Sequence, residues 1–135
     1  MGLAEGKLFE AAKNGNLDLF QEAVTSGAMI DCRDMMEQTP LMWASWKGYG
    51  KIVQKLLALG ADPNAKNLFD KTALHCAAEG RRRTVCVELL KSGANPEAPD
   101  NSGLTAFDIA HRNRSPMDLL ALPLSPRQGI LPSHR

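Results

Sequence analysis

Residues 39–64 read TPLMWASWKGYGKIVQKLLALGADPN, and residues 72–97 repeat this arrangement 33 positions later as TALHCAAEGRRRTVCVELLKSGANPE. Both segments have a leading threonine, a leucine and an alanine at fixed offsets, a leucine pair and a closing glycine–alanine step before a proline. The same phase continues beyond them, at Leu8 and Ala11 upstream and at Thr105 downstream. A period that is maintained through most of a chain predicts stacked structural repeats.

Each unit of this period is predicted to contain two short helices and a connecting segment. Thr39 and Pro40 suit a helix start, because the threonine hydroxyl can accept from free backbone N–H groups and proline has no N–H to leave unpaired. Gly48 ends this helix, and a second apolar helix follows and ends near Gly60. The polar, proline-containing segment 62–71 is expected to be extended and turned. Such a helix pair cannot bury its apolar faces alone, so it must stack on copies of itself.

With these residues the chain resembles the ankyrin-repeat family. The family's T-P-L-H-x-A-A run is similar to residues 39–45 and 72–78, and its L-L-x-x-G-A-D-x-N run is similar to residues 56–64 and 89–95. The resemblance covers about residues 3–122. It implies an all-α solenoid of stacked helix-turn-helix units joined by hairpin-like loops. Family members share this scaffold and differ in partner, so the resemblance implies protein binding without naming the partner.

We expect one ankyrin-repeat domain over residues 1–122 and a flexible, proline-containing tail over residues 123–135. The period divides the domain into an N-terminal capping repeat at about 6–38, full repeats at 39–71 and 72–104, and a truncated C-terminal capping repeat at 105–122. A shortened form of a longer ankyrin protein would also produce such an ending.

Composition and charge exclude several classes of function. The chain has 135 residues, with 16 Lys and Arg against 15 Asp and Glu, and its net charge of +1 argues against a general binder of nucleic acid or of membrane surfaces. No apolar stretch approaches the roughly 20 residues that a membrane span needs, and the N-terminus does not resemble a secretory signal. We therefore expect an intracellular monomer in the cytoplasm, with the nucleus as the alternative location.

Catalysis is not predicted. An odd number of cysteines without Cys-x-x-Cys spacing, namely Cys32, Cys76 and Cys86, indicates reduced and mostly buried thiols rather than a disulfide framework or a zinc site. His75 stands beside Cys76, but adjacent helical residues point about 100° apart. The resemblance implies that this histidine is structural and bonds the loop of a neighbouring repeat. We expect no enzymatic activity, no metal and no cofactor.

The expected loop tips are residues 34–38, 67–71 and 100–104, and we call them the first, second and third tip. Apolar residues at the first two tips indicate a partner-binding surface. The resemblance places partners on the tips and on the exposed side of the first helices, which together form a concave face. Methionine and aromatic residues exposed there have the composition of an interface hot spot. The alternative is that these side chains fold back and cover a thin core. The residues predicted to bind a partner are Met35, Met36, Trp46, Lys47, Leu68 and Phe69, with Arg81 and Arg82 as further candidates.

The first two tips lack the glycine that the third tip has at Gly103, because Glu37 and Asp70 stand at the matching positions. If this position needs a positive φ angle, each substitution costs about 1 kcal/mol. The first two tips are therefore expected to be looser than is usual in the family.

Several functional alternatives remain open at this point. The main prediction is a protein–protein interaction module that binds or sequesters one partner through its concave face. The alternatives are a substrate adaptor or regulatory subunit of a larger complex, and a nucleic-acid or phosphate binder that uses the basic run Arg81–Arg83, for which a solvated run of charge is the commoner explanation. Two modification sites are also hypotheses: Asn64, whose context resembles that of hydroxylated ankyrin asparagines, and Ser125, which precedes a proline.

Overall fold

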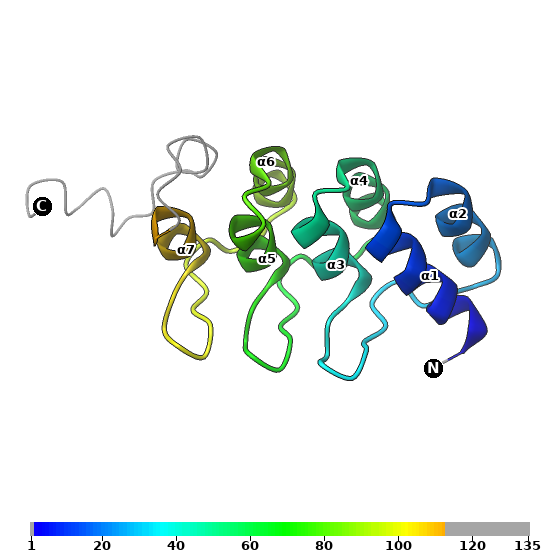
Figure 1. The fold of residues 1–135 in the computed structure, drawn as a ribbon, viewed down its shortest axis with the longest axis horizontal. Coiled ribbons are helices and arrows are strands. Elements are labelled where there is room, and N and C mark those ends of the chain that lie inside the picture. The colour runs from blue at the N-terminus through cyan, green and yellow to red at the C-terminus, as the bar shows by residue number, and fades with distance from the viewer. Residues whose placement is uncertain (1, 113–135) are drawn as a thin grey trace, which may run out of the picture.

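The computed structural model describes residues 2–112. The helices of this part of the chain lie in two parallel rows (Figure 1). The helices are α1 (Leu3–Asn14), α2 (Leu17–Thr25), α3 (Pro40–Lys47), α4 (Gly50–Ala58), α5 (Ala73–Glu79), α6 (Arg83–Lys91) and α7 (Ala106–Arg112). Within residues 2–112 there is no strand. The predicted all-α stack of helix pairs is confirmed, while residues 113–122 of the last unit and the tail at 123–135 lie outside the described residues.

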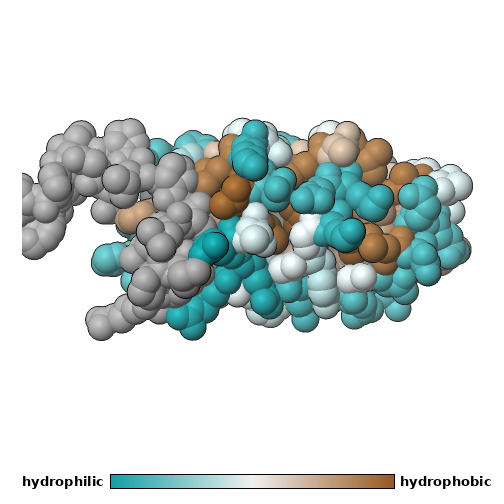
Figure 2. Space-filling view, turned by 90° about the horizontal axis from the view of Figure 1, so that it is seen from above, coloured by the Kyte–Doolittle hydropathy of each residue, from teal (hydrophilic) through white to brown (hydrophobic). Residues whose placement is uncertain are grey.

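The inner row consists of α1, α3, α5 and α7, and the outer row consists of α2, α4 and α6 (Figure 1). The loops between units project as tips on the side of the inner row that faces away from the outer helices. Seen from the outer row, polar residues cover most of the surface, and apolar residues show between the helices (Figure 2). Tips and inner helices therefore form a face of their own, separate from the outer row.

The helix ends follow the chemistry expected of them. The Thr39 side chain accepts a hydrogen bond from the Met42 N–H at 3.3 Å, and Pro40 is the first residue of α3. Gly48 ends α3 at a φ of 84°, in the left-handed region that glycine enters without steric cost. At the N-terminus, α1 begins at Leu3, earlier than the start near residue 6 that we expected for the first unit.

The core repeats with the period of the sequence. Leu8, Leu41 and Leu74 on successive inner helices are at most 1% exposed. The alanines one turn later on the same helices are equally buried, and their small side chains let neighbouring helices approach closely: Ala11, Ala44, Ala77 and Ala110. Full burial of one leucine stabilises the fold by about 1.5–3 kcal/mol. Short helices with little stability of their own are therefore held together by stacking.

One polar side chain organises each tip, and these residues are also 33 positions apart: Asp34, Asn67 and Asp100. The Asn67 Oδ1 atom, for example, accepts from the N–H groups of Phe69 at 2.8 Å and Lys71 at 3.0 Å. Asp34 and Asp100 accept from the equivalent pairs of N–H groups in their own tips. The three tips therefore have one backbone conformation.

Successive tips are also joined to each other by the backbone. The Leu68 N–H donates to the Met36 carbonyl oxygen at 3.1 Å, and the Asn101 N–H donates to the Phe69 carbonyl oxygen at 2.9 Å. These bonds align the tips into a continuous wall beside the inner helices.

Three residues other than glycine adopt a positive φ angle in residues 2–112. Glu37 and Asp70 have φ angles of 62° and 61°, at the position that Gly103 occupies with a φ of 83°. This position therefore needs a positive φ angle, and the backbone strain expected for Glu37 and Asp70 applies to the first two tips.

The third is Arg81, whose φ is 61°. It occupies the place that Gly15 and Gly48 take in the first two units, because the glycine of the third unit comes one residue early, as Gly80. The basic run Arg81–Arg83 lies only partly between the helices, since Arg83 is the first residue of α6.

Candidate functional site

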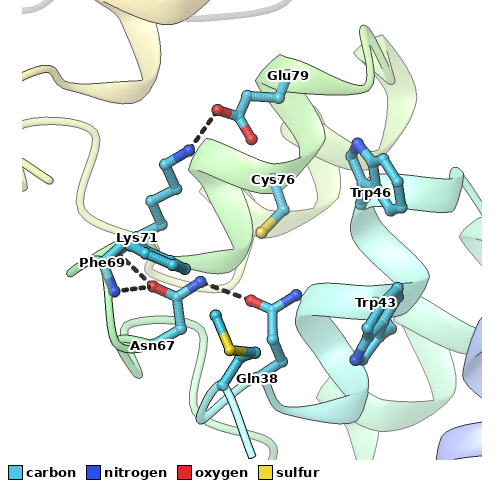
Figure 3. Close-up of a pocket in the computed structure, with 9 residues that line it drawn as sticks. Gln38, Trp43, Trp46, Asn67, Phe69, Lys71, Cys76 and Glu79 are labelled. Atoms are coloured by element: carbon cyan, nitrogen blue, oxygen red, sulfur yellow. Dashed lines mark hydrogen bonds and ion pairs between the residues drawn. The ribbon is translucent and has the colours of Figure 1, made fainter.

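A groove of about 310 Å³ lies where the first two tips face helices α3 and α5 (Figure 3). Phe69 comes from the second tip, Trp43 and Trp46 come from α3, and Cys76 comes from α5. We call this the aromatic groove, and its lining residues are Met36, Gln38, Trp43, Trp46, Asn67, Phe69, Lys71, Cys76 and Glu79.

The apolar residues of the aromatic groove are neither buried nor free in solvent. Met36, Trp46 and Phe69 are 45%, 43% and 42% exposed. Their neighbours Met35 and Leu68 are more exposed and do not line the groove. Met36 and Phe69 thus turn toward the helices, and a large share of their surface still faces water.

Several contacts hold the rings of Trp43 and Trp46 in place. The two rings meet edge to face with their centroids 6.0 Å apart, and the Trp43 Nε1–H donates to an oxygen of Asp34 at 3.0 Å. Lys13 and Lys47 place their ammonium nitrogens 4.7 Å and 5.3 Å from the ring centroids of Trp43 and Trp46, respectively. Such cation–π contacts orient the rings and leave positive charge beside them.

Polar side chains cross the groove in two pairs. The Asn67 Nδ2 atom donates to the Gln38 Oε1 atom at 2.5 Å, which links the first two tips (Figure 3). The Lys71 ammonium pairs with the Glu79 carboxylate at 2.6 Å, which links the second tip to α5. The tips are therefore attached to the helices, and the groove exists before any partner binds.

Cys76 is the only thiol that lines the aromatic groove, and burial raises its pKa to about 12. The thiolate is the reactive form of cysteine, so this side chain is an inert apolar surface at neutral pH. Burial likewise raises the pKa of Cys32 to about 11. Cys32, Cys76 and Cys86 are all free of disulfides.

His75 bonds the tip of the next unit, as the resemblance implied. Its Nε2 atom lies 2.8 Å from the Leu104 carbonyl oxygen, and its Nδ1 atom accepts from the Thr72 N–H at 3.1 Å. Both ring nitrogens are therefore engaged in structure. Residues 2–112 contain no group of three or more histidine, cysteine or acidic side chains that could hold a metal ion.

The structure brings together only some of the residues that the sequence singled out. Met36, Trp46 and Phe69 share the aromatic groove, and Lys47 stacks on Trp46 from outside it. Arg81 and Arg82 do not line the groove.

Arg82 instead donates from Nε to the Trp46 carbonyl oxygen at 3.0 Å, so part of its guanidinium is used in the junction between the second and third units. Asn64 also has a structural role, because its side chain bonds the Asn95 N–H at 2.7 Å and the Gly93 carbonyl at 3.1 Å. Ser125 lies outside the described residues.

Sequence reasoning missed several lining residues: Gln38, Trp43, Asn67, Lys71, Cys76 and Glu79. For Trp43 the signal was available, since it precedes Trp46 by three positions and side chains at that spacing share one face of a helix. For Asn67 the 33-residue repetition of Asp34 and Asp100 was the available signal.

These features define a class of protein: a helical repeat domain with a preformed groove on its inner face. The family model for ankyrin repeats (three copies) matches residues 7–67 and again residues 52–122. The chain belongs to the ankyrin-repeat family, and the resemblance drawn from the sequence is confirmed.

Ankyrin repeats are generally protein–protein interaction modules and are typically not enzymes. A comparison with curated proteins found no match to the chain. None of the helices within residues 2–112 has both the length and the apolar character that a membrane crossing requires.

Proposed function

We propose that this protein binds or sequesters one protein partner through the aromatic groove. The observation that carries the proposal is the half-exposed set of Met36, Trp46 and Phe69, gathered from two tips and one helix into a single concavity. Tryptophan and other large apolar side chains in a pocket are the usual centre of a binding hot spot.

Preorganisation supports this proposal. The tips are held by the side chains of Asp34 and Asn67, and the two tips are joined by the Leu68–Met36 backbone bond. A partner therefore does not have to order the loops when it binds, which removes a large entropic cost. The Trp43–Asp34 hydrogen bond fixes the ring of Trp43 in the same way.

The arginine run supports a nucleic-acid or phosphate function less well. The Nε–H of Arg82 is used by the Trp46 carbonyl oxygen, and neither Arg81 nor Arg83 lines the aromatic groove. Salt separates the two functions, because a complex that rests on phosphate contacts weakens steeply between about 50 and 200 mM salt. Binding at the aromatic groove is expected to change much less over that range.

The test is an affinity purification that compares groove variants with tip variants. We expect Met36→Ser with Phe69→Ser to reduce recovery of the partner by about tenfold or more, since truncating a hot-spot residue costs 2 kcal/mol or more. The matched control is Met35→Ser with Leu68→Ser, which removes equally apolar residues from the same tips but outside the groove. Mass spectrometry identifies the proteins, and circular dichroism checks that both variants keep their helices.

Two outcomes would contradict the proposal. One is an unchanged set of captured proteins with the groove variant, which would return the search to the arginine run. The other is loss of helicity in the groove variant alone, which would show that Met36 and Phe69 serve as core cover.

A further inference from the structure

Two lysines give the aromatic groove an excess of available positive charge. The ammonium groups of Lys13 and Lys47 lie against Trp43 and Trp46. Neither ammonium group makes an ion pair or a hydrogen bond with any residue in the described part of the chain. Both charges are therefore available to a bound partner.

The carboxylates near the groove are already engaged. Asp34 accepts from the Met36 and Gln38 N–H groups through one oxygen and from the Trp43 ring through the other. Glu79 is paired with Lys71. Among the groups that line the groove or flank its tryptophans, three lysines (Lys13, Lys47 and Lys71) stand against two carboxylates (Asp34 and Glu79), and this excess of positive charge complements an acidic ligand.

A cationic ligand fits the aromatic groove poorly for the same reason. Tryptophan faces attract cations, but Lys13 and Lys47 already occupy positions over these two rings. A second cation would meet like charge there and would find no unengaged carboxylate among the lining residues.

The groove also presents hydrogen-bond donors rather than acceptors. Gln38 uses its oxygen to accept from Asn67, and its Nε2–H₂ group makes no hydrogen bond within residues 2–112 (Figure 3). The Trp46 Nε1–H likewise has no acceptor among those residues, unlike the Trp43 Nε1–H. Two donors beside an apolar cavity suit the carbonyl groups of a peptide backbone or a carboxylate.

A second pocket lies toward the N-terminal end of the face. A neighbouring pocket of about 400 Å³ is lined by Gly6, Phe9, Glu10, Lys13 and Asp34, so Lys13 and Asp34 lie between the two cavities. Glu10 is an exposed carboxylate in that pocket. An acidic segment in the aromatic groove can reach Lys13, but Glu10 would repel a carboxylate placed further along this pocket.

We propose that the partner segment is an extended acidic peptide that inserts one aliphatic or aromatic side chain between Phe69 and the two tryptophans. A carboxylate of the peptide pairs with Lys13 or Lys47, and Gln38 donates to its backbone. This inference rests on the proposed function, since it names the chemistry of the segment that occupies the same groove.

The experiment is a selection of random 12-residue peptides displayed on phage against the full chain. We expect the selected peptides to share a large apolar residue with Asp or Glu close to it, and to be depleted in Lys and Arg. One synthetic peptide from the selection is then titrated against the protein and followed by tryptophan fluorescence. The chain contains two tryptophans, and both line the aromatic groove, so the signal reports on this site.

A charge cycle then tests the acidic contact directly. Replacing the Asp or Glu of the peptide by its amide should weaken binding about 2–5-fold, which is the range for one exposed ion pair. The same replacement should have little effect on the variant Lys13→Gln with Lys47→Gln. Lys51→Gln with Lys55→Gln is the matched control, since it removes the same charge from the outer helix α4.

Each contrary outcome has a distinct meaning. Selected peptides that are neutral or basic, no common sequence, or equal binding by the Lys13/Lys47 variant would overturn the inference, while the proposed function stands if Met36→Ser with Phe69→Ser abolishes binding. Peptides that bind this groove variant as tightly as the wild type would overturn the proposed function itself. Concentration-dependent dimerisation that the groove variant abolishes would place a second copy of the chain in the groove and overturn the acidic-peptide inference.

Discussion

At the scale of single residues, His75 shows how one buried polar side chain joins two units. It is 1% exposed, its Nδ1 atom accepts from the Thr72 N–H, and its Nε2 atom faces the Leu104 carbonyl of the next tip. A carbonyl can only accept, so Nε2 carries the proton and the ring is neutral. Protonation of Nδ1 would set a new N–H against the Thr72 N–H and break the helix cap.

The stability of the protein should therefore depend on pH through His75. Burial lowers the pKa of this histidine, although the Leu104 carbonyl and Asp100 oppose the shift. A folded-state pKa below that of the unfolded chain means that the histidine's contribution is complete above the unfolded value of about 6.5 and is lost as the pH falls through that value toward the folded one. We expect the free energy of unfolding to decrease between pH 7.5 and pH 5.

Urea unfolding at several pH values measures this effect. His75→Gln should lower the free energy of unfolding by about 1–3 kcal/mol at pH 7.5 and flatten its pH dependence, because the variant lacks the buried imidazole. His111→Gln, at an exposed position of α7, should keep the wild-type slope. An equal slope in all three proteins would show that His75 does not carry the effect.

At the scale of elements, the tips depend on a single side chain each. Helices of seven to twelve residues have little stability in isolation, and the tips between them have no core of their own. Asn67 compensates in the second tip, where its amide bonds Phe69, Lys71 and Gln38. The conformation of the tip, and with it the position of Phe69, follows from this residue.

Asn67→Ala should therefore destabilise the second tip and weaken the groove together. We expect a loss of about 1–3 kcal/mol in the free energy of unfolding, since two N–H groups lose their acceptor. Binding of the selected peptide should weaken as well. The control is Asn101→Ala, the same substitution on the exposed third tip, which should change stability by less than about 0.5 kcal/mol. Similar losses in both variants would contradict the assigned role of Asn67.

At the scale of the whole molecule, close contact between units holds the solenoid together. A side chain at Gly80 would place its Cβ atom 2.3 Å from the Trp46 carbonyl oxygen. The same carbonyl accepts from Arg82, so the junction of the second and third units leaves no room for a methyl group. This junction also carries the aromatic groove, which draws residues from both units.

Gly80→Ala should therefore push the second and third units slightly apart and destabilise the fold. We expect the free energy of unfolding to decrease by about 1–3 kcal/mol, as in other overpacked sites. Tryptophan fluorescence should also change, because Trp46 lies at the contact. Gly50→Ala is the control: no atom lies within 4 Å of its added Cβ, and alanine should be neutral or slightly stabilising at this helix start. Indistinguishable denaturation curves for the two variants would refute the steric argument.

The period of 33 residues determined much of the fold in advance, because it repeats local signals. Thr39, Pro40 and Gly48 specify where a helix begins and ends through their own backbone chemistry, and the structure follows them. The inward leucines and alanines follow from helical spacing. The exposure of the tip methionines and of Phe69 was also predictable, since an apolar residue in a turn has few neighbours to cover it and faces solvent at least in part.

The aromatic groove itself was decided by tertiary structure. Met36 and Phe69 line the groove while Met35 and Leu68 do not, and composition cannot distinguish two neighbours within one turn. Gln38 meets Asn67 across 29 positions of sequence. The sequence determined the units because helix starts, helix ends and apolar faces depend on residues a few positions apart. The groove depends on how two units stack, and its contacts exist only once the stacking has placed distant residues together.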